Sequence, residues 1–287
     1  MSDADCAIAL AAGVVGDWWT LLIVREVVGG TTRFDALQRS LGVSRKVLAE
    51  RLHRLVADGV LHREPYSDRP PRHDYLLTAA GQGLLPVLVA LQDWGTRYVA
   101  GDGSLTATSA ATSPESRRVQ ALVGTQVPAM TLTAGSADEL DPFSADGWTV
   151  AYCFPGAFAP GPQAYPSGWG DIPGAGGCTL ESTTYRDRAP DFAAAGAAVV
   201  GISTQRPDQL AAFAEHAHLP FRLLSDQDNR LAAALRLPTF RAAGSLRLKR
   251  LTLLVDGTRT VRAVQYPVPD PRASVAEALS LVRAGQG

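Results

Sequence analysis

Cys178 is the residue of this sequence best placed to do chemistry. The run Gly177-Cys178-Thr179-Leu180-Glu181 follows a stretch rich in glycine and proline, IPGAGG, and begins a helical pattern. The thiol is therefore expected in the first turn of a helix, where free backbone N–H groups and the helix dipole favour an anion. Because such surroundings lower the pKa of a cysteine, we predict a thiolate nucleophile at Cys178.

Other arrangements of reactive residues are weak. The five histidines show no metal-ligand spacing with cysteines or acidic residues. The sequence has no phosphate-binding loop, no dinucleotide fingerprint after a strand and no nucleophile elbow around a serine. We therefore expect neither a metal nor a cofactor.

Composition restricts the cellular compartment that we expect for the protein and the kinds of partner that its charge can attract. The net charge is −1, so any basic patch that attracts nucleic acid must be local. Three cysteines, Cys6, Cys153 and Cys178, are too few and odd in number for a disulfide scaffold, and they suit a reducing cytosol. The apolar stretch 7–15 is too short to span a bilayer and follows acidic residues. We predict a cytoplasmic protein without a membrane segment.

The C-terminal half must position Cys178, and its pattern alternates strands with helices. Buried strands are predicted at 148–154, 197–203, 221–226 and 251–256. Helices are predicted after Cys178, at about 207–217 and at 275–283. This alternation predicts an α/β domain with a sheet covered on both faces.

The N-terminal part is mainly helical. An apolar helix containing 18–26 ends at Gly29-Gly30, and Phe34, Leu37 and Leu41 then recur at helical spacing. Gly42 makes a turn, and Ser44 can cap a second, basic helix. Two short strands around an arginine-bearing tip follow. The order helix, turn, helix, strand pair predicts a winged helix-turn-helix.

A local basic excess lies in this part of the chain. Residues 33–72 contain nine Arg and Lys against five Asp and Glu, an excess of +4. Such a patch would meet DNA phosphates, with the N-terminus of the second helix in the major groove. An arginine-decorated helical hairpin for protein contacts is the alternative. The predicted DNA-binding residues are Arg33, Ser44, Arg45, Lys46, Arg51, Arg54, Arg69 and Arg72.

A flexible linker is predicted between the two parts. Residues 101–116 lack apolar periodicity and are rich in Ser, Thr, Ala and Gly. We therefore predict a winged-helix domain at 1–100, the linker at 101–116, and an α/β domain at 117–287.

Residues 6–98 resemble the HxlR family of winged helix-turn-helix transcription regulators. The resemblance depends on the runs WTLLI at 19–23, RF at 33–34, VLAERL at 47–52, PPR at 70–72 and LLP at 84–86. It implies a homodimer on operator DNA, with the helix at 80–99 as the dimer element. Cys6 stands where several members carry a cysteine that senses oxidants or electrophiles, although a free cysteine is often only a small buried residue.

Residues 120–284 resemble the peroxiredoxins of the thioredoxin fold, closest to the Q-type group. The matching runs are FP at 154–155, GCTxE at 177–181, YRD at 185–187, GIS at 201–203, LSD at 224–226 and Arg250. The resemblance implies that Cys178 is the peroxidatic cysteine of a thiol-dependent peroxidase, with a hydroperoxide substrate and a thiol reductant. It also implies that Arg250 holds the thiolate and the peroxide oxygens.

The sequence departs from the peroxiredoxin pattern at two positions. Ala175 stands where the family usually has a Thr or Ser that binds the peroxide, and Thr179 is a possible substitute. Thr183 stands where a resolving cysteine is often found. The remaining redox partners are Cys153, Cys6 or an external thiol. A bond between Cys6 and Cys178 would link peroxide oxidation to the DNA-binding module.

Three functions fit these observations. The first is a peroxide-responsive regulator in which oxidation of Cys178 changes the two recognition helices of a dimer. The second is a thiol peroxidase whose winged-helix module only localises or dimerises it. The third is a regulator with an inactive peroxiredoxin fold.

Overall fold

The computed structural model describes residues 6–69, 71–135, 138–143, 147–161, 165–242 and 244–285. The chain divides into two compact units, Met1–Leu88 and Val89–Gly287. Each unit is described by itself.

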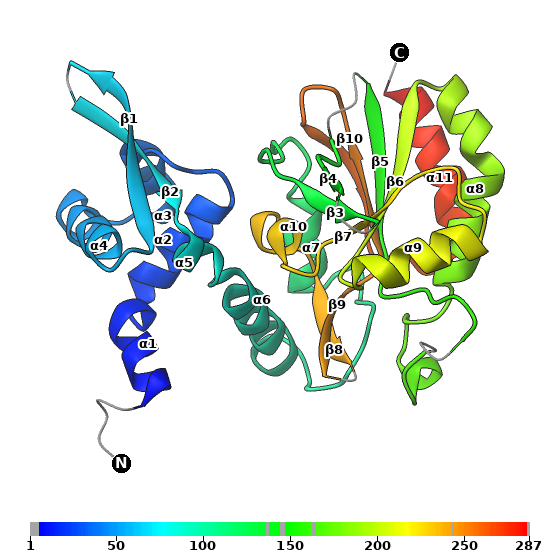
Figure 1. The fold of residues 1–287 in the computed structure, drawn as a ribbon, viewed down its shortest axis with the longest axis horizontal. Coiled ribbons are helices and arrows are strands. Elements are labelled where there is room, and N and C mark those ends of the chain that lie inside the picture. The colour runs from blue at the N-terminus through cyan, green and yellow to red at the C-terminus, as the bar shows by residue number, and fades with distance from the viewer. Residues whose placement is uncertain are drawn as a thin grey trace. The chain divides into compact units, whose positions relative to one another are not determined.

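The first unit is a winged helix-turn-helix, as predicted (Figure 1). Gly42, at φ 64°, ends the first helix of the motif, and the Ser44 hydroxyl caps the second by accepting from the Val47 N–H. The elements are α1 (Ala7–Val15), α2 (Trp18–Val28), α3 (Phe34–Leu41), α4 (Arg45–Ala57), β1 (Leu61–Asp68), β2 (Pro71–Leu77) and α5 (Ala79–Gln82).

Apolar residues at helical spacing build the core of this unit. Leu37 of α3, Leu48 and Leu52 of α4, and Ile23 and Val24 of α2 are at most 1% exposed. Burying each such side chain stabilises the fold by about 1.5–3 kcal/mol. Strands β1 and β2 pair antiparallel from Leu61↔Leu77 to Asp68↔Pro71 and form the predicted wing, whose tip residue Pro70 lies outside the described residues.

The predicted helix at 80–99 is not continuous. It consists of the end of α5, then α6 (Leu85–Trp94), and then a π-helical turn, η2 (Gly95–Val99). Gly83 ends α5 and Gly95 begins η2, because glycine stabilises a helix interior poorly. The prediction of one helix is therefore wrong, although helical structure fills most of the range.

The second unit is built on a seven-stranded sheet of order β11-β10-β5-β6-β7-β3-β4. Strands β5, β6 and β7 are parallel, whereas β10 runs antiparallel to β5. The strands are β3 (Leu132–Ala134), β4 (Asp138–Leu140), β5 (Trp148–Cys153), β6 (Ala197–Ser203), β7 (Leu223–Ser225), β10 (Leu251–Val255) and β11 (Val261–Gln265). A separate hairpin pairs β8 (Thr239–Ala242) with β9 (Ser245–Leu248).

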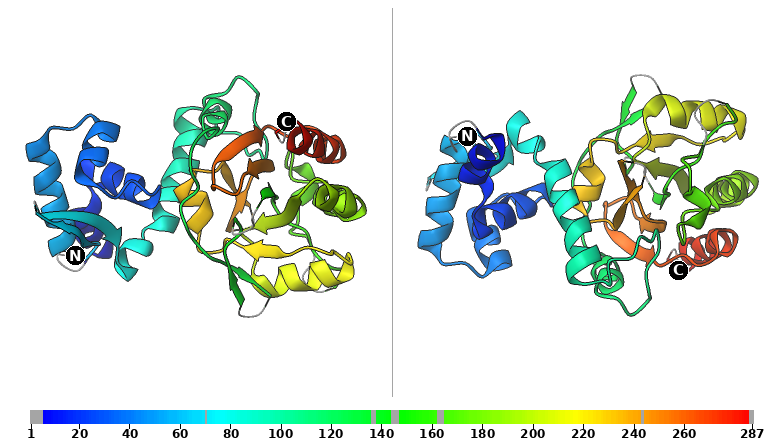
Figure 2. Two further views of the ribbon diagram at one scale, coloured as in Figure 1. Left: turned by 90° about the horizontal axis from the view of Figure 1, so that it is seen from above. Right: turned by 90° about the horizontal axis from the view of Figure 1, so that it is seen from below.

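Helices cover both faces of this sheet. Figure 2 shows α8 (Cys178–Ala194), α9 (Pro207–His216) and α11 (Pro271–Ala284) along one face. The shorter α7 (Pro114–Gln120) and α10 (Arg230–Ala234) lie on the other. The chain runs through β5–α8–β6 and later through β10–β11–α11, and β10 and β5 lie side by side between β11 and β6. This arrangement is a thioredoxin-like fold, as predicted. Because both faces are covered, the residues of 150–154 are all fully buried.

Residues 101–116, predicted as a flexible linker, pack against the second unit. Ala107 is fully buried, and its N–H donates to the Pro173 carbonyl oxygen at 2.8 Å. The last residues of the segment already belong to α7. Packing thus divides the chain at Leu88/Val89, before the boundary expected near residue 100, and the domain limits given above stay a prediction.

Among the described residues, no single helix has both the length and the apolar composition needed to cross a membrane. Helices α1 and α2 meet that requirement only as a pair, which is bent by 75°.

Candidate active site and nucleic-acid interface

Cys178 is the first residue of α8, where the sequence predicted it. Gly177 precedes it at φ 94°, a left-handed conformation that favours glycine. A Cβ atom at Gly177 would also lie 2.9 Å from the Pro271 ring. The glycine therefore permits the sharp entry that points the thiol into the protein, where Cys178 is 1% exposed.

Arg250 meets the Cys178 sulfur. The arginine immediately precedes β10, and its Nη2 donates to Sγ at 3.3 Å and to the Gly176 carbonyl oxygen at 2.6 Å. Its side chain is 3% exposed. The structure thus brings together two predicted site residues that are 72 positions apart in the chain.

Glu181 is a site residue whose role the sequence did not reveal. It lies one turn after Cys178 on α8, is fully buried, and forms an ion pair with Arg250 Nη1. A buried carboxylate needs such a partner, and the pair fixes the guanidinium against the sulfur. The acidic residue in the GCTxE run was the only available signal, and it did not identify the partner.

The predicted lowering of the Cys178 pKa is wrong for the thiol as it lies here. Burial is the largest influence and raises the pKa of the Cys178 thiol above its ordinary value. The Arg250 guanidinium and the Gly156 N–H favour the thiolate and lower this pKa, whereas the Glu181 carboxylate raises it. Position at a helix start is therefore outweighed by the removal of the sulfur from water.

The loop after β5, which supplies the Gly156 N–H, is held by Gln205. The Gln205 side-chain amide accepts from the Ala157 N–H at 2.8 Å and donates to the Ala157 carbonyl oxygen at 2.9 Å. Both residues are buried. No local sequence signal marks Gln205, because its partner lies 48 residues away.

Thr179 does not point at the sulfur. It is exposed, and its hydroxyl lies 3.2 Å from the hydroxyl of Tyr165, a second residue that the sequence did not indicate. Among the described residues, no hydrogen bond joins the Thr179 hydroxyl to Cys178. Its assignment as a peroxide-binding substitute for Ala175 therefore stays a prediction.

Ala175 serves packing. Its side chain belongs to a small core with Ala107, Trp169, Phe240 and Ala242. Its carbonyl oxygen lies 3.5 Å from Cys178 Sγ and accepts from the thiol. A methyl group thus occupies this core position and offers no hydrogen bond to a peroxide.

The other two cysteines are free thiols in different surroundings. Cys153 is fully buried at the end of β5, and burial strongly raises its pKa. Cys6 is partly exposed and precedes α1, where its side chain makes no capping hydrogen bond. Of these two, Cys6 is the less buried, and both stay predicted redox partners of Cys178.

The N-terminus of α4 presents three of the predicted DNA-binding residues. Ser44, Arg45 and Lys46 are exposed there. Arg45 forms an ion pair with Asp35 at 2.8 Å and lies over the Phe34 ring, so its guanidinium is oriented before any ligand arrives. Phosphate oxygens can replace such an exposed carboxylate partner at little cost.

The remaining predicted arginines divide into two kinds. Arg33, Arg54, Arg69 and Arg72 are exposed, the last two at the wing. Arg51 is only 22% exposed, and it pairs at 3.2 Å with Asp17, the residue that caps α2. Arg51 therefore holds two helices of the unit together.

Among the described residues, no group of three or more His, Cys, Asp or Glu side chains is arranged to hold a metal ion.

Two family models match this chain. Residues 14–102 match the model described as HxlR-like helix-turn-helix, and residues 172–264 match that of the AhpC/TSA family. Neither match reaches half of the chain, and the two do not overlap.

Curated relatives match the N-terminal part. An uncharacterized HTH-type transcriptional regulator of Mycobacterium tuberculosis is 45% identical over 93 residues, which are 32% of this chain and 59% of the relative. The chain thus spans 59% of the length of that relative. An uncharacterized HTH-type transcriptional regulator of Bacillus subtilis is 33% identical over 90 residues, 31% of this chain and 83% of the relative.

A solved structure matches the C-terminal part. Peroxidoxin BcpB from Mycobacterium tuberculosis is 29% identical, with a TM-score of 0.47 over 56% of this chain and 96% of that one.

Proposed function

The chain belongs to the HxlR-like helix-turn-helix regulators and carries an AhpC/TSA domain, and from this premise we propose that hydroperoxide controls its binding to operator DNA. One observation carries the proposal: the Arg250 guanidinium lies 3.3 Å from a cysteine sulfur at the start of a helix. That is the arrangement that thiolate attack on a peroxide requires.

The reaction is a two-electron transfer at sulfur. The Cys178 thiolate attacks one oxygen of the hydroperoxide, an S–O bond forms and the O–O bond breaks. Sulfur is oxidised to a sulfenic acid, and the other oxygen leaves as an alkoxide or hydroxide that takes up a proton. Arg250 donates to the anionic sulfur and to the developing charge on the leaving oxygen.

Sensing is favoured over turnover by what surrounds the sulfur. Ala175 provides no hydroxyl, burial raises the Cys178 pKa, and Thr183 occupies the usual place of a resolving thiol. The absence of a resolving thiol at Thr183 slows a catalytic cycle but not a single oxidation event, whereas Ala175 and the raised pKa slow the oxidation itself. Cys6 or an external thiol would condense with the sulfenic acid to form a disulfide and release water, and a further external thiol would then reduce this disulfide and regenerate the Cys178 thiol.

Oxidation at Cys178 has a direct structural route toward α6. Pro173, in the loop before the cysteine, accepts from the Ala107 N–H at 2.8 Å and from the Thr106 hydroxyl at 3.4 Å. A Cβ atom at Gly174 would lie 2.8 Å from the Thr108 Cβ, so these segments are in close contact. A shift of the Cys178 loop therefore displaces 106–108, which follows η2 and α6.

We expect the DNA-binding form to be a homodimer. Four large apolar side chains on α6 and η2 are 48–71% exposed: Leu91, Trp94, Tyr98 and Val99. Exposed apolar side chains on one helical segment suit pairing between two copies. Each copy would then place the N-terminus of its α4 in a major groove of a two-fold symmetric operator.

The test uses an operator selected from random DNA by the reduced full-length protein. Affinity is measured by fluorescence anisotropy before and after one equivalent of hydrogen peroxide, in wild type, Cys178→Ser and Cys6→Ser, with Cys153→Ala as the matched control. We expect a change of at least about tenfold in wild type and in the control, and none in Cys178→Ser. Cys6→Ser reports whether a disulfide carries the signal. Equal affinity of oxidised and reduced wild type would refute the proposal.

A further inference from the structure

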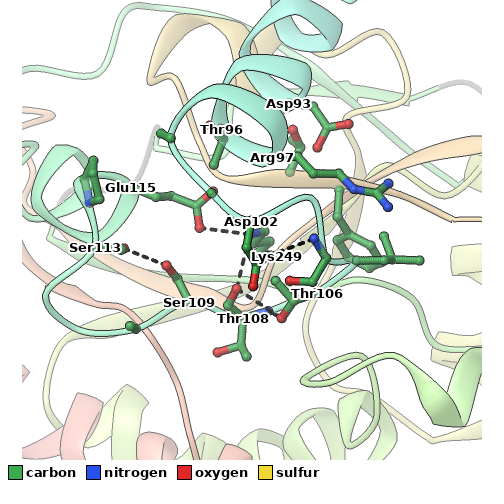
Figure 3. A pocket seen from close by; sticks show the side chains of 18 residues that line it. Asp93, Thr96, Arg97, Asp102, Thr106, Thr108, Ser109, Ser113, Glu115 and Lys249 are labelled. Carbon is green, nitrogen blue, oxygen red and sulfur yellow. Dashed lines mark hydrogen bonds and ion pairs between the residues drawn. The ribbon is translucent and has the colours of Figure 1, made fainter.

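A cavity of about 430 Å³ lies in the second unit, and Lys249, which precedes Arg250 in the chain, is among the residues that line it (Figure 3). One wall consists of η2 and the residues that follow it, and the other of the start of α7, the first residues of β8 and Lys249. The volume lies in the range of pockets that bind small molecules. Cys178 is not among the residues that line it.

Hydroxyl groups dominate the lining. They are contributed by Thr96, Ser104, Thr106, Thr108, Ser109, Ser113 and Thr239. The Phe240 ring adds an apolar surface. The Thr239 hydroxyl is buried and has no hydrogen-bond partner among the described residues. Such a wall suits a polar ligand that carries hydroxyl groups of its own.

Glu115 is the most unusual lining residue, because it is buried with one open oxygen. Its side chain is 3% exposed, and its Oε1 accepts both from Lys249 Nζ at 2.9 Å and from the Tyr266 hydroxyl. Its Oε2 is buried and has no hydrogen-bond partner among the described residues. A buried carboxylate oxygen without a donor is destabilising, and an occupant of the cavity can supply the donor.

The charges of the lining favour a cation. Three carboxylates, Asp93, Asp102 and Glu115, face two cations, Arg97 and Lys249, which leaves a net charge of −1. Both cations already donate to the protein, Arg97 to the Gly103 carbonyl oxygen and Lys249 to that of Thr108. Burial raises the pKa of Asp93, while the charges of Arg241, Lys249 and Arg97 act in the opposite direction. Asp102 accepts from the Ser104 N–H at 2.9 Å, so the open acceptor among these groups is Glu115 Oε2, while both cations are engaged.

We propose that this cavity binds a small hydroxylated primary amine, of the chemical class of the amino sugars. Its ammonium group donates to Asp93 and to the open oxygen of Glu115, and its hydroxyl groups meet the serine and threonine side chains. The occupant touches both the turn that follows α6 and the residue that precedes Arg250.

The first measurement is calorimetric titration of the reduced full-length protein, without DNA or peroxide, so that it does not depend on the redox proposal. The probes are glucosamine, glucose, N-acetylglucosamine and glucuronate, each up to about 10 mM. We expect glucosamine to bind at least about tenfold more tightly than the other three, because only it brings an ammonium group. Absence of glucosamine binding, equal binding of glucose, or tighter binding of glucuronate would each overturn the proposal.

Two variants locate the site. Asp93→Asn removes one carboxylate charge, and Thr239→Val removes a hydroxyl that has no partner in the protein. Thr239→Val should leave the melting temperature unchanged or higher, which separates loss of ligand from loss of fold. We expect the Kd of glucosamine to rise about tenfold in Asp93→Asn and severalfold in Thr239→Val. The exposed Asp228→Asn is the control. Wild-type affinity in both pocket variants places the amine elsewhere and overturns the assignment.

Discussion

At the scale of single residues, the Cys178 sulfur is subject to opposing influences. Arg250 and the Gly156 N–H favour its thiolate, while burial and the Glu181 carboxylate favour its thiol. Glu181 holds the Arg250 guanidinium in place by an ion pair. The same carboxylate raises the Cys178 pKa, which Arg250 lowers. Reactivity at this site therefore depends on pH and on the Glu181 charge.

The pH dependence of Cys178 alkylation follows from its raised pKa. Below that pKa the thiolate fraction grows about tenfold per pH unit. Because the pKa lies above the ordinary value for a cysteine, we expect the rate of reaction with iodoacetamide to rise steadily from pH 6 to pH 8.5 without a plateau. Mass spectrometry of the Cys178 peptide gives the rate. A rate that is already constant at pH 6 would mean that Arg250 outweighs burial.

Glu181→Gln should make Cys178 more acidic. The substitution keeps the side-chain shape but removes the charge that raises the Cys178 pKa, and it frees Arg250 to act on sulfur alone. We expect alkylation at pH 8 to be severalfold faster than in wild type. This increase corresponds to a thiolate that is more stable by about 1 kcal/mol. The exposed Glu139→Gln serves as the control. An unchanged or slower rate would show that Glu181 mainly positions the arginine.

At the scale of elements, helix starts position the functional groups of both units. Gly177 is the N-cap residue of α8, and its conformation sets the direction of the Cys178 thiol. Ser44 is the N-cap residue of α4, whose first residues, Arg45 and Lys46, are exposed. Asp226 caps the first turn of α10, because its carboxylate accepts from the Leu231 and Ala232 N–H groups at 3.0 and 2.8 Å. Substitutions in these first turns can therefore be chosen to change either the free energy of unfolding or the function, and the two effects can be measured independently.

In α4, Lys46→Ala and Arg51→Ala should have different effects. Lys46 is exposed, so its loss should weaken DNA binding and make the salt dependence shallower by about one unit of slope, without changing stability. Arg51 pairs with Asp17, so its loss should reduce the free energy of unfolding by about 1 kcal/mol. Anisotropy titrations at several salt concentrations and urea unfolding measure the two effects. Unaltered DNA binding by Lys46→Ala would move the interface away from this helix start.

Asp226 should make stability depend on pH. Burial raises its pKa to about 7, whereas an aspartate in an unfolded chain titrates near 4. The folded chain therefore holds an extra proton between about pH 4 and 7, and the contribution of Asp226 to stability falls as pH rises through this window. Asn cannot ionise at this position. We therefore expect Asp226→Asn to lower the free energy of unfolding by less at pH 8 than at pH 5, each measured against wild type at the same pH. A loss that grows with pH would show that the carboxylate is stabilised as an anion.

Local signals predicted the elements that depend on local chemistry. The turn at Gly42, the cap at Ser44 and the buried strand β5 (Trp148–Cys153) were all recognisable, because glycine, capping hydroxyls and apolar runs act over a few residues. The hairpin β8–β9, the turn η2 and the contacts of Glu181 and Gln205 were not. The contact partners of Glu181 and Gln205 lie 69 and 48 residues away, so no local pattern specifies them. The hairpin and the turn η2 are local structures whose signals were not recognised.

At the scale of the whole molecule, a helix-turn-helix regulator family and a peroxiredoxin-like fold occur in one chain. The exposed apolar side chains of α6 and η2 are the surface to which the proposed dimer is assigned. Trp94 and Tyr98 are 57% and 53% exposed, with ring centroids 6.1 Å apart. Burying such aromatic surface is the usual driving force of subunit pairing.

Trp94→Glu should weaken the dimer. A carboxylate in an apolar interface has to be desolvated without a partner, which costs several kcal/mol. We therefore expect the dimer dissociation constant to rise at least about a hundredfold. Analytical ultracentrifugation measures it, with the exposed Glu139→Gln as the control. A variant that stays dimeric at the same concentrations would assign pairing to another surface.

The residues from Val89 to 102 belong to both parts of the molecule: the HxlR-like match ends at 102, but packing assigns them to the second unit. Gln92, for example, donates to the Leu237 carbonyl oxygen at 2.7 Å. This sharing restricts evolution by recombination. A genetic exchange that replaced the C-terminal domain at residue 102 would leave the retained helix without the surface on which it packs.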